Sequence, residues 1–513
     1  MMLPRRKLLL VVTLFGVGGS LAATVAYAAY VRSSAYRVDV VTELSHKLGL
    51  AASIDSIHPL SLNSREFRGV RVMVPDGSTA VFSCDRAVWR DVSVEGRRRY
   101  ALDLSTGYLL LGTGQWRSSD YQKMLDSGLG HDFSRLRLSE IHMDRMDLEW
   151  FHPDFRLTLD GAYGEVLFNE DGTGRATLNS RTLNGVPLDS PVSVSASFTP
   201  GSGLTFHEVV LTVPTLPLSV LGLDRLLQST VTQGTFQGQL VYREPSADGV
   251  SRTLEAAGRL EDASLLELTQ PLPGGPYNGR VSATLDQVRF VDGRLDELRF
   301  QGNLSGVRLG DVIHAIQATQ DEGTADLRIH QAEYRNGVIR YLSVSGRADD
   351  ISAETISGLL GHGTMTGRLQ VRINSLIVVD DHIQSADLEV HAVAPPDQPG
   401  TIDRDALAAV AKELFGFDLQ MVLPKKIEYV ELGARLVLER GRLRIHGTHG
   451  PDGRTVATIR LFGRDWPVLR APDRTFEVPD LLALVRDRLE PFDAADLRRW
   501  WQEHHQQSQD TQD

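Results

Sequence analysis

The sequence predicts a mainly β protein: one N-terminal transmembrane helix, then a long curled antiparallel sheet with a few short helices. Two observations support this fold class. An uncharged stretch of 24 residues lies near the N-terminus, from Leu8 to Val31. From about residue 51 onward, segments such as "VSATLDQVRF" and "LQVRINSLIVV" alternate apolar and polar residues. That alternation is typical of strands with one apolar and one wetted face, and the Gly, Asp and Asn between segments suit hairpin turns.

Composition excludes several classes of protein. The chain has 513 residues, is 42% hydrophobic and 23% charged, and is therefore long and apolar enough to fold around a large core. Its formal net charge of -12 argues against general binding to nucleic-acid phosphates. Cys84 is the only cysteine, so an intrachain disulfide and a cysteine-based metal site are both excluded.

The N-terminal segment predicts a membrane anchor and its orientation. Arg5, Arg6 and Lys7 precede the apolar stretch 8–31. A helix rises about 1.5 Å per residue and needs about 20 residues to cross a bilayer, so this stretch is long enough. The basic cluster places residues 1–7 in the cytoplasm and the rest of the chain outside it. The alternative is a cleaved signal peptide, because Ala26-Tyr27-Ala28 has the small-x-small pattern of a cleavage site.

The region after the anchor, 36–150, is expected to begin with a helix and continue as sheet. Val38, Val41, Leu44 and Leu48 follow one another at steps of three and four, which predicts a short amphipathic helix ending near Gly49. Further on, "LRLSEIHMDRMDLEW" carries apolar pairs whose alternation slips by one between pairs. Such slips indicate bulges, which curl a sheet. The pairs are Leu136/Leu138, Ile141/Met143 and Met146/Leu148.

The region 151–395 is expected to hold repeated β-hairpins. The Asp292-Gly293 turn is followed by Leu298, Phe300 and Gly302, and the Asn336-Gly337 turn by Leu342, Val344 and Gly346. Nine residues separate the two glycines in each copy. A second recurrence is a helix-like segment that leads into Gly-Thr and a strand, at 234–235, 323–324 and 363–364. The alternative is that ordinary hairpin composition recurs in any all-β protein.

The C-terminal part is expected to close the sheet. The stretch "DQPG" after Pro395-Pro396 reads as a linker. Residues 401–463 then read as a helix followed by strands, with Thr401 or Asp403 near the N-cap and Gly416 after the helix. Two helices fall within 478–505, and residues 506–513 form a polar tail predicted to be disordered. In the last helix, Leu497, Trp500 and Trp501 form an apolar stripe that either plugs the open end of the sheet or contacts a membrane.

The sequence lacks the common catalytic and metal-binding motifs, so we expect a protein that is not an enzyme. The sequence contains no nucleophile elbow, no phosphate-binding glycine loop and no dinucleotide fingerprint. His446, His449 and Asp452 are close in sequence, but no further ligand is spaced to complete a metal site. We therefore expect no catalytic residue, no cofactor and no metal.

The chain resembles the AsmA-like family of bacterial envelope proteins. The resemblance lies in the single N-terminal anchor, in the run "LSHKLGLAASIDSIHPLSLNSREFRGVRVMVPDG", in "LRLSEIHMDRMDLEW" and in a helix leading into "GTMTGRLQV". It covers the anchor and much of 36–395, with 36–150 as a chorein-like β region. The resemblance implies a repeating β-groove of the kind found in chorein-type, bridge-like lipid transporters.

Such a groove would carry acyl chains on its apolar inner face. The implied function is an inner-membrane-anchored, periplasmic protein that holds or conducts phospholipid in envelope and outer-membrane biogenesis. Its partners would be phospholipid or another acyl-chain lipid, the inner membrane, and outer-membrane or envelope proteins, with no nucleic acid. The alternative is an envelope scaffold or assembly factor of the same topology. The residues that would line the groove are Leu136, Leu138, Ile141, Met143, Leu298, Phe300, Leu342 and Val344.

Overall fold

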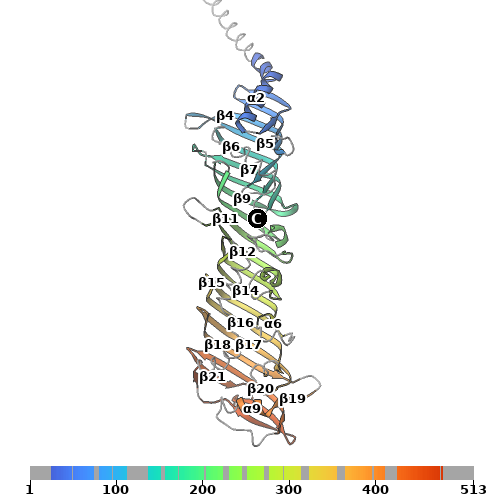
Figure 1. Ribbon diagram of the computed structural model, residues 1–513, viewed down its shortest axis with the longest axis vertical. Helices are drawn as coiled ribbons and strands as arrows, with labels where there is room; N and C mark the ends of the chain where they lie inside the picture. The colour runs from blue at the N-terminus through green and yellow to red at the C-terminus, as the bar shows by residue number, and fades with distance from the viewer. Residues whose placement is uncertain are drawn as a thin grey trace, which may run out of the picture. The chain divides into compact units, whose positions relative to one another are not determined.

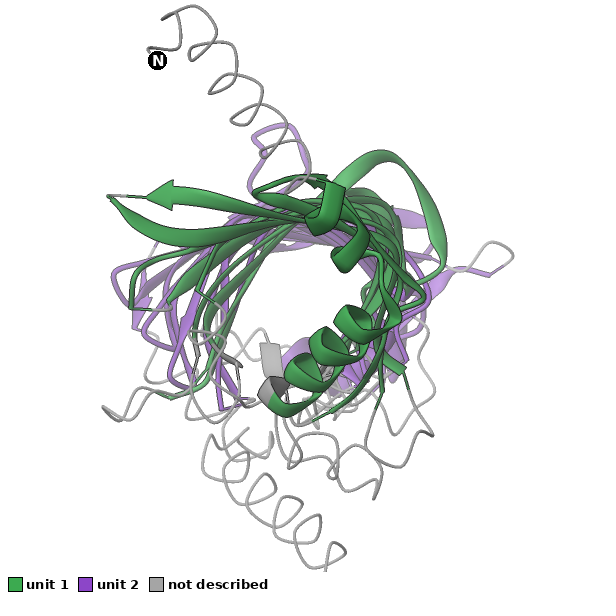
Figure 2. Ribbon diagram, turned by 90° about the horizontal axis from the view of Figure 1, so that it is seen from above, with its two compact units in different colours: residues 1–216, 220–226, 237–254 green, residues 217–219, 227–236, 255–513 purple. Residues whose placement is uncertain are grey.

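A computed structural model describes most of the chain between residues 25 and 477 (Figure 1). Within that range it leaves out 49, 74–79, 95, 113–136, 152–155, 172, 201–203, 223–229, 245–250, 271–275, 293, 313–322, 355–356, 358–363, 395–397, 411–423 and 474. The chain forms two compact units (Figure 2). Unit 1 comprises Met1–Leu216, Val220–Leu226 and Gln237–Leu254, and unit 2 comprises Pro217–Ser219, Leu227–Phe236 and Glu255–Asp513.

The expected mainly β fold is confirmed, since the described residues form 24 strands and a few short helices. The helices are α2 Ser34–Leu48, the 3-10 helix η2 Leu218–Leu221, α5 Leu265–Thr269, α6 Leu309–Val312 and α9 Arg404–Val410. None of the described helices is both long and apolar enough to cross a membrane. The predicted anchor lies mostly outside the described residues, which include only its last part, 25–31, as helix.

Unit 1 is a sheet whose strands follow a curve rather than a plane (Figure 2). From β1 to β10, neighbouring strands pair antiparallel except β5 and β6, which run parallel from Tyr100↔Leu138 to Gly112↔Phe151. The expectation of a wholly antiparallel sheet is therefore wrong at this pair. A parallel pair cannot be joined by a hairpin turn, because the chain must return to the same end of the sheet before the second strand begins. Residues 113–137 connect β5 to β6. The strands are β1 Ala51–Ser53, β2 Ser56–Ser61, β3 Ser64–Met73, β4 Ala80–Val94, β5 Arg97–Gly112, β6 Leu138–Phe151, β7 Arg156–Phe168, β8 Gly174–Leu183, β9 Val186–Pro200 and β10 Leu204–Pro217.

The predicted irregularity of β6 is confirmed. Its pairing with β7 shifts register between Met143 and Met146 and again between Met146 and Leu148, and Arg145 has a φ of 55°. Met143, Met146 and Leu148 are all buried. The bulges thus keep apolar residues on one face where strict alternation would send some of them to solvent.

The strands after β10 are β11 Thr235–Arg243 and β12 Thr253–Ser264, each divided between the units, and then those of unit 2. In unit 2 the strands from β13 to β18 pair antiparallel in chain order, and β18 pairs with β20. The unit 2 strands are β13 Arg280–Val291, β14 Arg294–Arg308, β15 Thr324–Arg335, β16 Val338–Ser352, β17 Arg368–Val379, β18 His382–Val393, β19 Gly400–Asp403, β20 Lys426–Glu439, β21 Arg442–Gly447, β22 Thr455–Leu461, β23 Arg464–Arg470 and β24 Phe476–Glu477.

Unit 2 contains a structural repeat with a period of 44 residues. A segment outside the sheet follows each of the strands β12, β14 and β16 before the next strand begins. The backbone N–H of the first residue of this segment donates to the carbonyl of a glycine that lies shortly before the next strand. These bonds are Leu265→Gly279 at 3.0 Å, Leu309→Gly323 at 2.8 Å and Ala353→Gly367 at 3.1 Å. The equivalent bond at 218 joins Leu218 to Gly234. Gly234 and Gly323 were expected, but the third position is Gly367 rather than Gly363.

The hairpin turns and bulges keep the same period. Turn residues with positive φ recur at Asp292, Asn336 and Asp380. Each repeat also has a register shift beside a polar pair, after Leu285, Ile329 and Ile373. Because the extra residue of each bulge is polar, apolar side chains before and after it stay on the same face.

Gly302 and Gly346 hold equivalent positions in two repeats. A Cβ at Gly302 would overlap Ser282 O and the Ala283 backbone, and a Cβ at Gly346 would overlap Asp326 O and the Leu327 backbone. Gly346 also has a φ of 156°. The nine-residue spacing seen in the sequence therefore marks the point where each returning strand lies too close to its neighbour for a side chain.

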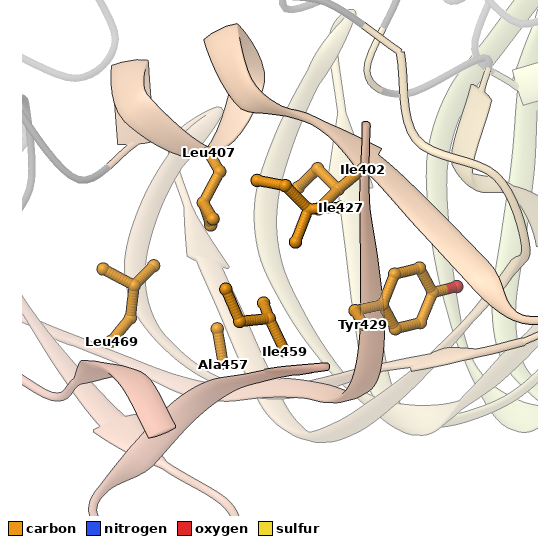
Figure 3. Packing of buried hydrophobic residues seen from close by; sticks show 7 residues of the cluster. All are labelled: Ile402, Leu407, Ile427, Tyr429, Ala457, Ile459 and Leu469. Carbon is orange, nitrogen blue, oxygen red and sulfur yellow. The ribbon is translucent and has the colours of Figure 1, made fainter. Parts of the chain in front are cut away.

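The C-terminal part of unit 2 contains a packed apolar cluster (Figure 3). β20 pairs with β18 and β21 along its second half, and with β19 and β22 along its first half. The strand therefore changes neighbours along its length, and Leu407 of α9 belongs to the same buried cluster as Ile427 and Tyr429 of β20. The buried cluster consists of Ile402, Leu407, Ile427, Tyr429, Ala457, Ile459 and Leu469.

Of the two residues expected near the N-cap of the helix, Asp403 has that position and Thr401 does not. Thr401 lies in β19, and α9 begins at Arg404, so Asp403 directly precedes the helix. The Asp403 carboxylate accepts hydrogen bonds from Thr364 N at 2.9 Å and Thr364 Oγ1 at 2.8 Å. Asp403 thus fastens the chain before β17 to this end of unit 2. Gly416, which was expected to follow the end of this helix, lies outside the described residues.

Candidate functional site

Unit 1 contains a cavity of about 730 Å³ between α2 and one face of the sheet. This volume is within the range of roughly 300–1,000 Å³ that is typical of small-molecule sites. Most of the lining side chains are aliphatic or aromatic, and they come from α2 and from strands β3 to β10. They are Tyr36, Val40, Glu43, Leu44, Leu50, Ile54, Arg65, Phe67, Val70, Val72, Val81, Phe82, Ala87, Trp89, Asp91, Arg98, Tyr100, Leu102, Leu104, Leu109, Arg137, Leu138, Ile141, Met143, Val166, Phe168, Ala176, Phe198 and Phe206.

The floor of the cavity is built from rows of directly paired residues. One row runs across five strands, β4 to β8, through Trp89, Leu102, Ile141, Val166 and Ala176. Residues that face one another in neighbouring strands have side chains on the same face of the sheet. The period-two pattern of the sequence therefore becomes a continuous apolar surface here.

The helix α2 covers the floor with a different stripe from the one predicted. Tyr36, Val40 and Leu44 line the cavity at steps of four, whereas Val38 is 59% exposed. The helix and its end near residue 48 are confirmed, but Val38 lies off the covered face. The sequence pattern misled because Tyr36, an aromatic residue with a polar tip, supplies the first position of the stripe.

One side of the cavity carries an aromatic wall. The rings of Phe168 and Phe198 meet edge to face with centroids 5.7 Å apart, and those of Phe198 and Phe206 are 6.1 Å apart. Such pairs pack with defined geometry, and their edges present apolar surface to whatever occupies the cavity. No hydrogen-bonding atom belongs to these three side chains, so the wall favours an apolar occupant.

The rim of the cavity is charged, in contrast to the floor. The charged lining residues, here called the rim, are Arg65, Asp91, Arg98, Glu43 and Arg137, of which Glu43, Arg98 and Arg137 are exposed. Arg98 forms an ion pair with Asp91 and lies over the ring of Tyr100. The described lining contains no His, Cys, Ser or Thr side chain, the types that most often act as bases and nucleophiles.

Arg65 links this rim to the helix that precedes α2. Its Nε and Nη2 donate to the Tyr27 hydroxyl at 3.1 and 2.9 Å. Its guanidinium also lies 5.9 Å from the centre of the Tyr27 ring and 5.7 Å from that of Tyr36. The charge is thus held between two aromatic rings, an arrangement that suits a weakly hydrated guanidinium.

The expected groove-lining residues fall in three groups. Leu138, Ile141 and Met143 line the cavity of unit 1. Leu298, Phe300, Leu342 and Val344 belong to unit 2, where Phe300 and Leu342 both pair with Ala332, and Val344 is buried against Ile329. Leu136 lies outside the described residues, as do Arg5, Arg6 and Lys7 and the C-terminal residues Leu497, Trp500 and Trp501.

The histidines considered in the sequence do not come together around a site. His449 is buried, and burial lowers its pKa below the ordinary value for histidine. His446 lies in β21, paired with Arg435 of β20. Within the described part of the chain, no three His, Cys, Asp or Glu residues are grouped so that they could hold a metal ion.

The charged rim was missed by sequence reasoning. Its residues are isolated in the sequence, and the arginine run 97–99 that contains Arg98 was not singled out. The hairpin between β4 and β5 nevertheless brings Arg98 beside Asp91.

Comparison of the chain with family models, with curated proteins and with solved structures finds no match.

On the opposite face of β3, Glu66 is the most enclosed carboxylate of unit 1's described ion pairs. Its side chain is 7% exposed and accepts from Arg86 Nε at 2.8 Å and Arg68 Nε at 2.6 Å. The hydrogen bonds from Arg86 and then Arg68 lower the pKa of Glu66. A carboxyl whose pKa is lower in the folded state than in the unfolded state stabilises the fold at any pH above its unfolded-state pKa of about 4.3. This stabilisation is lost as the pH falls through the folded-state pKa.

We therefore expect Glu66→Gln to lower the free energy of unfolding at pH 7 by about 1–3 kcal/mol, because both charge-assisted bonds are lost. Denaturant titrations of both proteins at pH 7 and at about pH 3 measure this, and the gap should narrow at the lower pH. Glu170→Gln is the matched control, since Glu170 pairs with Arg97 at an exposed site and should change stability by less than about 1 kcal/mol. Equal losses in the two variants would contradict this account of Glu66.

Proposed function

We propose that this protein holds phospholipid or another acyl-chain lipid, with the acyl chain in the unit 1 cavity and the polar headgroup at its charged rim. The main support is the division of the lining into an apolar floor and a rim that bears Arg65, Asp91 and Arg98. A phospholipid is divided in the same way, into an apolar acyl chain and a charged headgroup. Each methylene moved from water to an apolar surface contributes about 0.8 kcal/mol, so a long chain gains enough to be retained.

The rim suits a headgroup with a phosphate. The Arg65 guanidinium donates hydrogen bonds to the neutral Tyr27 hydroxyl, whereas Arg98 is already paired with the Asp91 carboxylate. A guanidinium binds phosphate oxygens through two parallel hydrogen bonds. Asp91 and Glu43 lie on the same rim and would face the ammonium of a zwitterionic headgroup.

The wider setting of this proposal comes from the sequence. Residues 8–31 would anchor the chain in the inner membrane with its bulk in the periplasm, and the resemblance to AsmA-like proteins would place the lipid in envelope biogenesis. The apolar rows of unit 2, such as Phe300, Ala332 and Leu342, support a further lipid-contacting surface of the same kind.

Mass spectrometry of lipids that copurify with the full chain tests the proposal. The chain is extracted from membranes, exchanged through detergent and analysed for bound lipid. We expect phospholipid to remain in a fixed ratio to protein, and to be released when the protein is denatured. Lipid that washes out completely during detergent exchange would count against the proposal.

A further inference from the structure

The hairpin between β2 and β3 carries apolar residues where a turn in water would carry polar ones. Leu62 stands at the turn and is 65% exposed, and Leu60, near the end of β2, is 53% exposed. Turn positions are usually taken by Gly, Pro, Asn, Asp and Ser. Two exposed leucines at a hairpin tip therefore need a reason other than the fold.

The tip is attached to the end of the predicted membrane anchor. The Tyr27 hydroxyl donates to the carbonyl of Leu62 at 3.5 Å and accepts from Arg65, which follows the tip on β3. Tyr27 belongs to the apolar stretch 8–31 and is four residues from its end. At about 1.5 Å per residue, Tyr27 lies about 6 Å inside the outer end of that stretch. Whatever medium surrounds Tyr27 also surrounds the hairpin tip.

The helix that carries Tyr27 has further exposed apolar side chains. Val25 and Tyr30, on the same described helix as Tyr27, are 62% and 52% exposed. Tyrosine is enriched at the boundary between membrane and water, and Arg32 follows directly, as cationic residues do at such a boundary. The helix and the hairpin are therefore joined through Tyr27, and both carry exposed apolar side chains.

We propose that the tip of the β2–β3 hairpin, residues 60–63, inserts into the outer interface of the bilayer that holds the anchor. This inference rests on the anchor in the proposed function and adds the surface by which the folded domain contacts the membrane. Arg65 lies at both the hairpin and the cavity rim, so insertion places the rim at the headgroup level. A lipid then passes between bilayer and cavity without its acyl chain crossing water.

A polarity-sensitive fluorophore on the full chain, reconstituted in vesicles of phosphatidylethanolamine and phosphatidylglycerol, tests the insertion. Leu62→Cys provides the attachment site, since an exposed turn residue can be replaced without disturbing a core. The native Cys84 does not compete, because it is buried and burial raises its pKa to about 12. Asn336→Cys, at the turn between β15 and β16, is the matched control hairpin.

We expect the probe at 62 to emit at shorter wavelength and to be quenched by nitroxide-bearing lipid, while the probe at 336 shows neither effect. Flotation of the protein with the vesicles reports the anchor separately. A probe at 62 that behaves like the one at 336, on protein that floats, overturns the insertion and leaves the anchor standing. A probe that is shielded but not quenched by nitroxide lipid indicates contact with protein instead and also overturns it. Protein that fails to float overturns both insertion and anchor.

Discussion

Replacing Ala176 by phenylalanine should lower lipid retention by the full chain at least about tenfold, which corresponds to about 1.4 kcal/mol of binding free energy. Ala176 lies in β8 between Val166 and Ala196 of the neighbouring strands and lines the cavity. A phenyl ring there occupies space that the acyl chain would use. Phenylalanine is also favoured in strands, so the sheet should tolerate it.

The matched control is Thr177→Phe, one residue further along the same strand. Thr177 is exposed, and adjacent residues of a strand point to opposite faces. Lipid copurification and thermal unfolding of both variants measure the effect. Equal retention by wild type and Ala176→Phe would show that the cavity does not hold the lipid, and a large loss in Thr177→Phe would show that the effect is not specific to the cavity.

Replacing Ile459 by alanine should lower the free energy of unfolding by about 2–5 kcal/mol, because it opens a cavity in a packed core. Ile459 is 0% exposed, pairs with Tyr429 of β20 and belongs to the buried cluster shown in Figure 3. Denaturant titration and hydrogen exchange in β20 and β22 measure the loss. Exchange should accelerate first in these strands, since their apolar contacts are the ones removed.

Ile383→Ala is the control, since Ile383 is 53% exposed and its loss should cost less than about 0.5 kcal/mol. Together the two variants separate filled core from open surface in unit 2. If Ile459→Ala were as stable as Ile383→Ala, this end of unit 2 would not be a packed core, and its role in closing the sheet would be wrong.

Local pattern predicted much of the fold. The alternation around Leu298 and Leu342 placed two strands, the positive-φ turns at Asp292 and Asn336 matched hairpin positions, and the slips in 136–150 marked real bulges. These features depend on residues close in sequence, so single segments carry the signal. The parallel pairing of β5 and β6 could not be predicted, because it depends on where a long connection returns the chain.

The cavity was harder to predict than the sheet. Leu138, Ile141 and Met143 were expected to face an apolar groove, and they line the cavity. Arg65 was not singled out, because its partner Tyr27 is 38 residues away and lies within an apolar stretch read only as an anchor. Polar contacts between distant segments leave no period in the sequence. The 44-residue repeat could have been found by aligning the polar pairs at 286, 330 and 374.

The proposed function requires that an acyl chain occupies the unit 1 cavity. A phospholipid with a photoactivatable diazirine in its acyl chain, incorporated into vesicles with the full chain, tests this most directly. After illumination, mass spectrometry locates the crosslinked residues. We expect crosslinks on cavity-lining residues of β5 and β6, among them Leu102, Ile141 and Met143, and their loss in Ala176→Phe. Crosslinks confined to the N-terminal stretch 8–31, with none in the lining, would contradict the account.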